Sequence, residues 1–169
     1  EMDALQMIIR PDIGLFTTLG DAHNEGFEDQ ATKLAEKLIL FKDAKTIIFN
    51  ADNIEVRNAI KHKFGDRNLL SWGKSSDATL FQILDVVITS HDSRIDILFQ
   101  KKLNTIHIPF TDVASIENAL HCVAFLLVLG YNLESIETGM KRLQNIPMRL
   151  EMKNGIQGSI LINDTYNAD

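Results

Sequence analysis

Over the first third of the chain, continuous apolar runs typical of buried strands alternate with segments whose apolar positions have helical spacing. Residues 13–19 and 46–50 are apolar on both faces, which is typical of parallel strands buried between helices. Residues 28–41 place apolar side chains at helical spacing, and a second helix, capped by Asp52 or Asn53, is expected up to residue 64. The alternation of strand and helix predicts a parallel α/β sheet flanked by helices.

The pattern changes in the middle of the chain. Short strands with alternating polarity are expected there, at residues 69–72, 79–89, 94–100 and 105–109. They predict an antiparallel meander at the edge of the sheet. Two helices, 113–129 and 133–143, and two final strands, 149–152 and 159–163, are expected after it. Asn154-Gly155 is the expected turn between those last strands.

The length of 169 residues is enough for one domain with its own core. We expect a domain boundary at Ile146-Pro147, so that residues 1–147 are the later part of one domain and residues 148–169 begin another. The fold class expected is therefore α/β, with a mostly parallel sheet, an antiparallel edge meander and the start of a second α/β domain.

Composition excludes several classes of function. A net charge of −6 argues against non-specific binding to nucleic acid, and no apolar run reaches the ~18 residues of a membrane span. The single cysteine, Cys122, excludes an internal disulfide and fits a reducing compartment such as the cytoplasm. Because Cys122 falls in an apolar helical pattern, we expect a buried, inert thiol.

The clearest candidate for chemistry is His23, which follows the first predicted strand. Its position puts an imidazole near the carboxyl end of a buried strand, where open α/β sheets hold ligands and metals. The alternative from the residues alone is a histidine that caps the next helix or bonds the backbone. The sequence stops just after the last predicted strand, at Asp169, so a fragment of a larger protein is expected.

Five segments together resemble a known family. Residues 10–14 (Arg-Pro-Asp-Ile-Gly), 17–20 and 22–27 resemble the central domain of the Mur ligases. Residues 148–151 and 164–168 (Asp-Thr-Tyr-Asn-Ala) resemble the start of that family's C-terminal domain. The resemblance is greatest to the subgroup that adds D-alanyl-D-alanine to UDP-N-acetylmuramoyl-tripeptide, in the form fused to an alanine racemase. It implies a cytoplasmic ligase of peptidoglycan synthesis that uses ATP to form an acyl phosphate.

The resemblance also implies two magnesium ligands. His23 matches a family histidine that binds Mg²⁺ near the γ-phosphate, and Lys37 matches a lysine that many members carry as a carbamate. A carbamate would give a second Mg²⁺ an anionic oxygen ligand. Ile39 stands where the family often has a glutamate, which makes Lys33 a rival to Lys37. Taken alone, a lysine on a helix is typically a solvated side chain.

Three further residues are implied to bind the nucleotide. Asn118 matches an asparagine that recognises adenine, although Ala114 and Ser115 replace a His-Asn pair common in the family. Arg149 matches a residue that meets the phosphates, and Asp164 one that accepts hydrogen bonds from the ribose. From the residues alone, Asn118 could be an exposed polar residue, and the other two could be polar residues at strand ends.

A phosphate-binding loop of the Gly-x-x-x-x-Gly-Lys-Ser/Thr type does not occur in the 169 residues, and residues 73–76 (Gly-Lys-Ser-Ser) are only a partial match. Since the family carries this loop upstream, we expect the isolated chain to be inactive. Three alternatives stay open: another Mur ligase, a ligase similar to folylpolyglutamate synthase, and a non-catalytic α/β binding module with a degenerate site.

Overall fold

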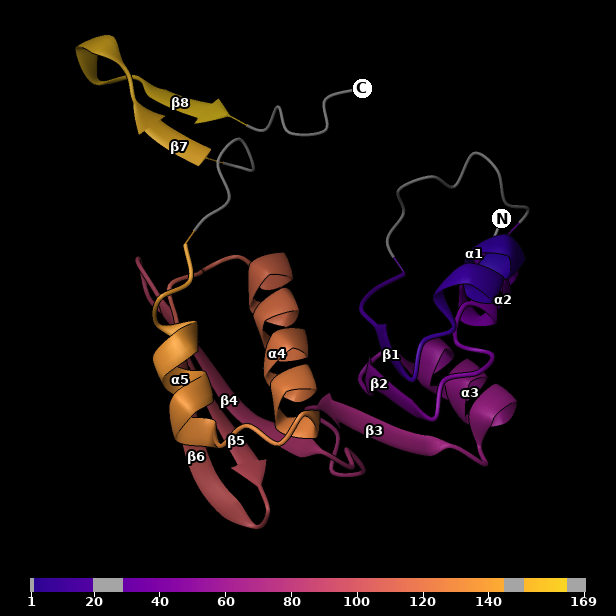
Figure 1. The fold of residues 1–169 in the computed structure, drawn as a ribbon. Coiled ribbons are helices and arrows are strands. Elements are labelled where there is room, and N and C mark those ends of the chain that lie inside the picture. The colour runs from indigo at the N-terminus through magenta and orange to yellow at the C-terminus, as the bar shows by residue number, and fades with distance from the viewer. Residues whose placement is uncertain (1, 20–28, 145–150, 164–169) are drawn as a thin grey trace.

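The main body of the chain is a six-stranded mixed sheet with helices on both faces (Figure 1). The computed structural model describes residues 2–19, 29–144 and 151–163. Strands lie side by side in sequence order: β1 (Ile13–Phe16), β2 (Thr46–Asn50), β3 (Asn68–Gly73), β4 (Phe81–Ile88), β5 (Ser93–Phe99) and β6 (Lys102–Ile108). Pairs from β1 to β4 are parallel, and β4–β5 and β5–β6 are antiparallel. The predicted fold class, a mostly parallel α/β sheet with an antiparallel edge, is confirmed.

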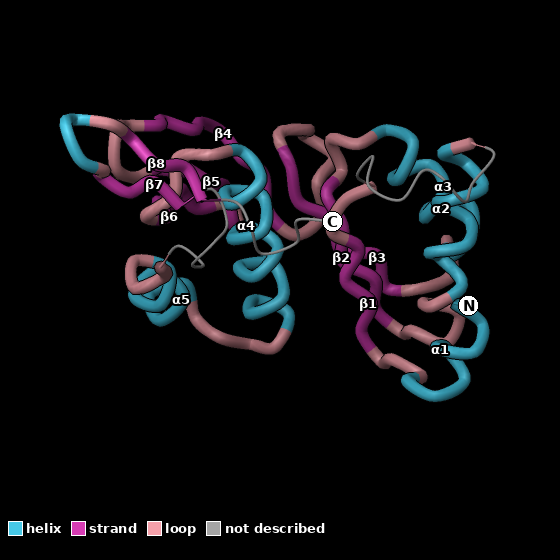
Figure 2. Tube along the Cα trace, turned by 90° about the horizontal axis from the view of Figure 1, so that it is seen from above, coloured by secondary structure: helices cyan, strands magenta, loops and turns pink. Residues whose placement is uncertain are grey.

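The helices form two groups, which cover opposite faces of the sheet (Figures 1 and 2). The first group is α1 (Met2–Ile9), α2 (Gln30–Ile39) and α3 (Ile54–Phe64), and the second is α4 (Val113–Val128) and α5 (Leu133–Met140). Four helices begin at a polar cap whose side chain accepts a backbone N–H three residues on, namely Asp29, Asn53, Asp112 and Asn132. Local capping therefore sets where these helices start. Helix α1 was not predicted.

Strand β2 is covered on both faces. Ile47 and Phe49 pack in one core with side chains of α2 and α3. Ile48 points the other way, into a second core that contains Trp72 and side chains of α4 such as Leu120. Because successive side chains of a strand alternate between faces, the apolar run of β2 needs helices on both sides.

The two halves of the sheet meet between β3 and β4. These strands are parallel neighbours, although only residues 74–80 connect them. The pairing is correspondingly short, joining Trp72 to Phe81 and Gly73 to Gln82. The Trp72 and Phe81 rings stack with centroids 5.9 Å apart, so an aromatic contact secures the junction.

Several predicted boundaries were wrong. Strand β1 ends at Phe16 rather than at residue 19, because the Thr17 carbonyl is bound by a side chain instead of a strand. Strands β7 (Glu151–Asn154) and β8 (Ile160–Asn163) form a separate hairpin. Its loop is not the predicted Asn154-Gly155 turn, because Asn154 pairs with Ile160 and a short 3₁₀ helix, η2 (Ile156–Gly158), lies between.

Two further points concern exposure and order. Cys122 is exposed, so the prediction of a buried thiol was wrong. Helix α4 is apolar around most of its surface, yet one side of it faces solvent and carries this residue. The expected domain boundary at Ile146-Pro147 lies outside the described residues. In the part of the chain that is described, no helix is both long and apolar enough to cross a membrane.

Candidate functional site

The carboxyl ends of the parallel strands lie at one edge of the sheet, which we call the carboxyl edge. It comprises Thr17 after β1, Asn50–Asp52 at the end of β2, and Trp72–Ser75 at the end of β3. Helix α4 begins at the same edge, because it follows β6 and β6 runs in the direction of β1–β4. Ligands of open α/β sheets bind at such an edge.

Asn50 connects the end of β2 to α4. Its amide Nδ2 donates a hydrogen bond to Glu117 Oε1 at 3.1 Å. Its Oδ1 accepts from the backbone N–H of Asp52 at 2.9 Å. One amide therefore orders both the turn after β2 and a carboxylate on α4.

Asp52 connects the same turn to the loop after β3. Its carboxylate accepts the backbone N–H of Lys74 (2.8 Å to Oδ1 and 3.0 Å to Oδ2) and that of Ser75 (3.2 Å). Gly73 is required beside it, since its φ is +153° and a Cβ there would lie 2.6 Å from Asp52 Oδ1. The loop at residues 73–76, which partly matches a phosphate-binding loop, therefore binds the Asp52 carboxylate of the same chain through its backbone N–H groups. Asn53, not Asp52, caps α3.

Asp77 holds the rest of this loop. The Ser75 hydroxyl donates to its carboxylate, and Arg57 and Lys61 of α3 lie 3.5 and 3.8 Å away. The Ser75 hydrogen bond, helped by the two cations, keeps the pKa of Asp77 below its ordinary value. The loop between β3 and β4 is thus fixed to both β2 and α3.

His121 on α4 is a deeply buried polar group near this edge, with 1% of its surface exposed. Its Nδ1 lies 3.2 Å from Trp72 Nε1, and its Nε2 lies 3.0 Å from the Thr17 carbonyl. An indole N–H can only donate, so Nδ1 is the acceptor and Nε2 carries the proton. Burial lowers the pKa of His121, against the opposing effects of Glu117 and the Thr17 carbonyl. The neutral ring therefore accepts the Trp72 N–H at Nδ1 and donates from Nε2 to the Thr17 carbonyl.

Of the five predicted site residues, two are described. Lys37 is half-buried on α2, about 10 Å along the axis from Gln30, and its side chain donates no hydrogen bond within the described ranges. Its rival Lys33 is buried one turn nearer the start of the helix. Asn118 is exposed on α4, next to Glu117. These two predicted residues lie on different helices, and their roles stay predictions.

The other three predicted residues, His23, Arg149 and Asp164, lie outside the described residues. Sequence reasoning also missed the residues that the structure does bring together, which are Asn50, Asp52, Glu117 and His121. Two signals could have found them. Asn50-Ala51-Asp52 covers the end of a buried strand and the turn after it, and His121 is a polar residue inside an apolar helical run.

Asn118 is the predicted nucleotide-binding residue that the structure describes. Asn118 is exposed, so its amide is free to donate and accept towards a planar base. In the described ranges no three His, Cys, Asp or Glu side chains gather as a metal site would need. The exposed amide of Asn118 therefore suits contact with a nucleotide base, whereas of the two predicted magnesium ligands only Lys37 is described.

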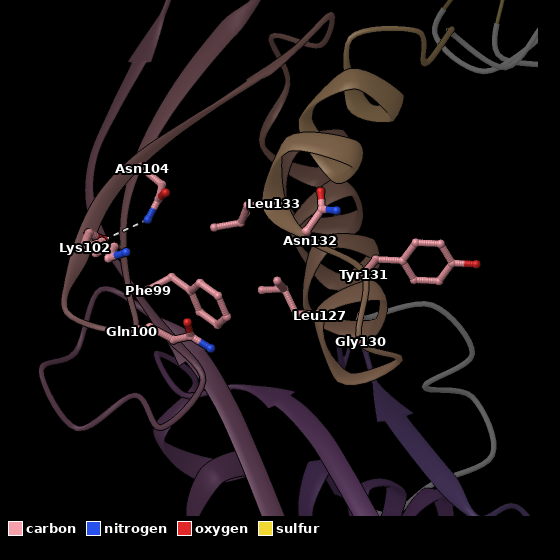
Figure 3. Close-up of a pocket in the computed structure, with 9 residues that line it drawn as sticks. All are labelled: Phe99, Gln100, Lys102, Asn104, Leu127, Gly130, Tyr131, Asn132 and Leu133. Carbon is pink, nitrogen blue, oxygen red and sulfur yellow. Dashed lines mark hydrogen bonds between the residues drawn. The ribbon is translucent and has the colours of Figure 1, made fainter.

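A pocket of about 410 Å³ lies at the opposite edge of the sheet (Figure 3). It lies between the β5–β6 turn and the connection from α4 to α5, with Phe99, Leu127 and Leu133 as its apolar residues. Asn104 on its polar side donates to the Lys102 carbonyl at 2.8 Å. Helix α4, at about 24 Å, separates this pocket from the carboxyl edge.

Comparison with known proteins decides the family. Residues 1–126 match the family model of the Mur ligase middle domain. The chain belongs to the Mur ligase family. One curated relative is the UDP-N-acetylmuramoyl-tripeptide–D-alanyl-D-alanine ligase of Escherichia coli K12, 26% identical over 165 residues, which are 96% of this chain and 36% of the relative. Another is a UDP-N-acetylmuramoyl-L-alanyl-D-glutamate–2,6-diaminopimelate ligase of Clostridium acetobutylicum, 26% identical over 82% of this chain and 28% of the relative.

Solved structures show the same Mur ligase fold. MurF from Acinetobacter baumannii has a TM-score of 0.84 at 22% identity, over 100% of this chain and 37% of that chain. MurF from Thermotoga maritima, solved in complex with ADP, has a TM-score of 0.75 at 19% identity, over 97% of this chain and 38% of that chain. The chain thus spans little more than a third of these Mur ligases.

Proposed function

We propose that this chain is part of an ATP-dependent carbon–nitrogen ligase of peptidoglycan synthesis, which we call the complete ligase. Its proposed reaction joins D-alanyl-D-alanine to UDP-N-acetylmuramoyl-tripeptide in the cytoplasm. Family membership supports the reaction class, and the names of the E. coli relative and of the MurF structures support this substrate pair. A fused alanine racemase stays a prediction from the resemblance.

The proposed chemistry has two balanced steps. The tripeptide carboxylate takes the γ-phosphoryl group of ATP, which gives an acyl phosphate and ADP. The amine of D-alanyl-D-alanine then attacks the acyl carbon, an amide forms, phosphate leaves and the amine loses a proton. Bound Mg²⁺ supplies neutralising charge for the phosphoryl group. Among this chain's residues, His23 and a carbamylated Lys37 would hold the metal, Asn118 would bind adenine, Arg149 would meet phosphate and Asp164 the ribose.

One observation carries the proposal for the described residues. Asn118 is exposed on the same turn of α4 as Glu117, which Asn50 binds at the end of β2. A base-binding amide would thus lie beside a carboxyl edge whose loops are held by Asp52 and His121. Prearranged groups of this kind favour binding because little ordering is left to be done when the ligand arrives.

We further propose that the chain supplies only part of the catalytic machinery. Residues 1–147 would be the later part of the ATP-binding domain, and residues 148–169 would begin the C-terminal domain. The chain spans 36% of its E. coli relative, and its 169 residues contain no phosphate-binding loop. The isolated chain should therefore show negligible ATP hydrolysis, and clear turnover by it would contradict this division.

The deciding experiment is ADP release by the complete ligase with Mg-ATP. UDP-N-acetylmuramoyl-tripeptide and D-alanyl-D-alanine are supplied separately and together, and we expect release only with both. His23→Ala should abolish this release with little change in melting temperature. Near-normal turnover of that variant would remove His23 from the proposed site.

A second candidate, another Mur ligase, is favoured by the similarity to the diaminopimelate ligase of C. acetobutylicum. The same assay with UDP-N-acetylmuramoyl-L-alanyl-D-glutamate and diaminopimelate separates the two candidates. If a folded complete ligase releases no ADP with any of these combinations, a folate-type ligase or a non-catalytic binding module becomes the better proposal.

A further inference from the structure

The ring of His121 joins α4 to two strands of the sheet that do not pair with each other. The ring itself belongs to α4, Trp72 belongs to β3, and Thr17 is the first residue after β1. Within the six-stranded sheet, β1 pairs only with β2. The hydrogen bond from His121 to Thr17, which joins residues 104 positions apart, therefore ties the exit of β1 directly to α4.

The geometry of this link allows one arrangement of the three groups. The imidazole meets the Trp72 ring edge-on, with centroids 4.7 Å apart and planes at 82°. In that orientation Nδ1 receives the indole N–H while Nε2 faces the Thr17 carbonyl. A ring with both of its polar atoms paired and 1% of its surface exposed cannot turn without leaving a buried donor or acceptor unpaired.

Stability alone does not explain these polar groups. Burying an imidazole and an indole N–H costs desolvation, and replacing both partners by apolar groups of similar shape is often nearly neutral for stability. What an apolar pair would lose is the fixed place of the Thr17 carbonyl. Thr17 lies in the segment that leads to His23, and Asn118 lies one turn before His121 on α4.

We propose that His121 is a positioning residue, which holds the exit of β1 at Thr17 against α4 so that this exit and the helix carrying Asn118 keep one relative placement. The proposal rests on the proposed ligase function. Nothing in it requires His121 to touch a substrate. Its effect on catalysis would come through the chain that leaves β1 and through α4.

The test compares variants of the complete ligase that lose different parts of the link. His121→Leu combined with Trp72→Phe removes the link without leaving the indole N–H unpaired. We expect a melting temperature within about 5 °C of the parent, and a fall in kcat of about 10- to 100-fold with a smaller change in the KM for ATP. Unchanged kcat and KM in this folded double variant would overturn the proposal.

Two single substitutions keep the test decisive if the double variant does not fold. His121→Gln keeps a donor for the Thr17 carbonyl but not the acceptor for Trp72, whereas His121→Asn keeps an acceptor near Nδ1. We expect His121→Gln to keep most of the parent kcat and His121→Asn to keep little of it, although the two variants should have similar stability. An equal or reversed order would overturn the proposal. Thr105→Val is the matched control, because it removes one side-chain hydrogen bond, to Asp96, in the other half of the sheet.

A readout without activity separates this proposal from the proposed function. Amide hydrogen exchange of β1, which pairs with β2 over Ile13–Phe16, should become at least about ten-fold faster in the double variant, while the amides of β5 keep their protection. If the complete ligase were inactive with every substrate pair, faster exchange in β1 would still support the link. Unchanged exchange there would overturn it independently of the reaction.

Discussion

The parallel half of the sheet and the antiparallel half use their polar side chains in different ways. In the parallel half, β1–β3, the polar contacts at the carboxyl edge join different elements, as in Asn50 to Glu117 and Asp52 to Lys74. Other contacts, such as Lys45 to Asp12, lie at the amino ends of these strands. In the antiparallel half, β4–β6, they mostly join neighbouring strands or a helix to its adjacent strand. Arg94 on β5 lies 3.8 Å from Asp85 on β4, and His107 on β6 lies 3.2 Å from Glu137 of α5.

This difference distinguishes polar groups that fix the loops of a site from polar groups that form exposed pairs on the surface. At the carboxyl edge each contact fixes a loop, and His121 does so from a buried position. In the antiparallel half the charged partners are exposed or half-exposed, so their contribution to stability is small. The pocket at the far edge has volume, but neither Lys37 nor Asn118, the two predicted site residues that are described, lines it. Contacts between elements, rather than cavity size, therefore locate the candidate site.

The largest effect that would test this comparison is expected at Lys37. If Lys37 carries a carbamate, Lys37→Ala in the complete ligase should lower turnover by on the order of 100-fold or more, because an anionic metal ligand is lost. Added acetate or propionate should restore part of the activity by supplying a carboxylate. ADP release measures both effects, and ¹³C NMR with labelled bicarbonate detects the carbamate.

The control for Lys37 is its rival one turn earlier. Lys33 is buried, so the control is Lys33→Met, in which the new side chain keeps much of the volume of the lysine. Added acetate or propionate should not change the activity of this variant. Rescue of the Lys33 variant, with full activity of Lys37→Ala, would move the prediction to Lys33. Full activity of both variants would remove α2 from the chemistry and weaken the claim that the parallel half carries it.

The next largest effect is expected at Gly73, where the carboxyl edge is most crowded. Gly73→Ala puts a Cβ 2.6 Å from Asp52 Oδ1 at a φ of +153°, so we expect a loss of about 2–4 kcal/mol in the free energy of unfolding. Urea denaturation of the chain measures it. Gly130→Ala is the control, because φ there is also positive, at +88°, but nothing lies within 4 Å of the added Cβ.

Strain without a clash should make Gly130→Ala cost only about 1 kcal/mol. Adding Asp52→Ala to Gly73→Ala should relieve the clash and recover part of the loss. Equal losses at Gly73 and Gly130 would show that the contact between Asp52 and the loop is not tight in solution. The contrast between the carboxyl edge and the exposed pairs of the antiparallel half would then lose its main support.

The sequence was sufficient for most elements and insufficient for the contacts between them. Strand β2 and the starts of α4 and α5 were predicted at their observed residues, because local periodicity and polar caps determine them. Asp52 was equally acceptable as a cap by local rules, and only its contact with Lys74 shows its other role. His121 was not predicted as a site residue, and its partners, Thr17 and Trp72, are distant in the chain. Tertiary partners of this kind leave no local pattern.

A smaller effect should appear in the pH dependence of stability. Burial lowers the pKa of His121 below its ordinary value of 6.5, so the unfolded chain binds a proton more readily than the folded chain. The contribution of the neutral ring is fully present above pH 6.5 and is lost as the pH falls through 6.5 and below. Glu117 is the charged group that faces the ring, while Trp72 and Thr17 do not titrate in this range.

Urea denaturation between pH 7 and pH 5 measures this dependence. His121→Leu with Trp72→Phe should lose less stability on acidification than the parent chain, whereas Thr105→Val should keep the parent slope. Equal slopes for the parent and the double variant would mean that the ring is more exposed to solvent than its 1% surface indicates. The carboxyl edge would then not be distinguished by a buried titratable group.

The smallest effect is expected in the antiparallel half, at Glu137. Lys141 Nζ at 2.8 Å and His107 Nδ1 at 3.2 Å keep the pKa of Glu137 below its ordinary value of 4.5. Such a carboxylate stabilises the fold above pH 4.5, and this contribution is lost as the pH falls below that value.

Because these partners are solvent-exposed, Glu137→Gln should cost only about 0.5 kcal/mol at pH 7 in urea denaturation. Glu134→Gln, on the same helix, is the control and should cost less. A loss at Glu137 as large as that at Gly73→Ala would show that surface pairs hold the antiparallel half as firmly as the carboxyl edge is held, which would remove the physical basis for assigning the site to one half.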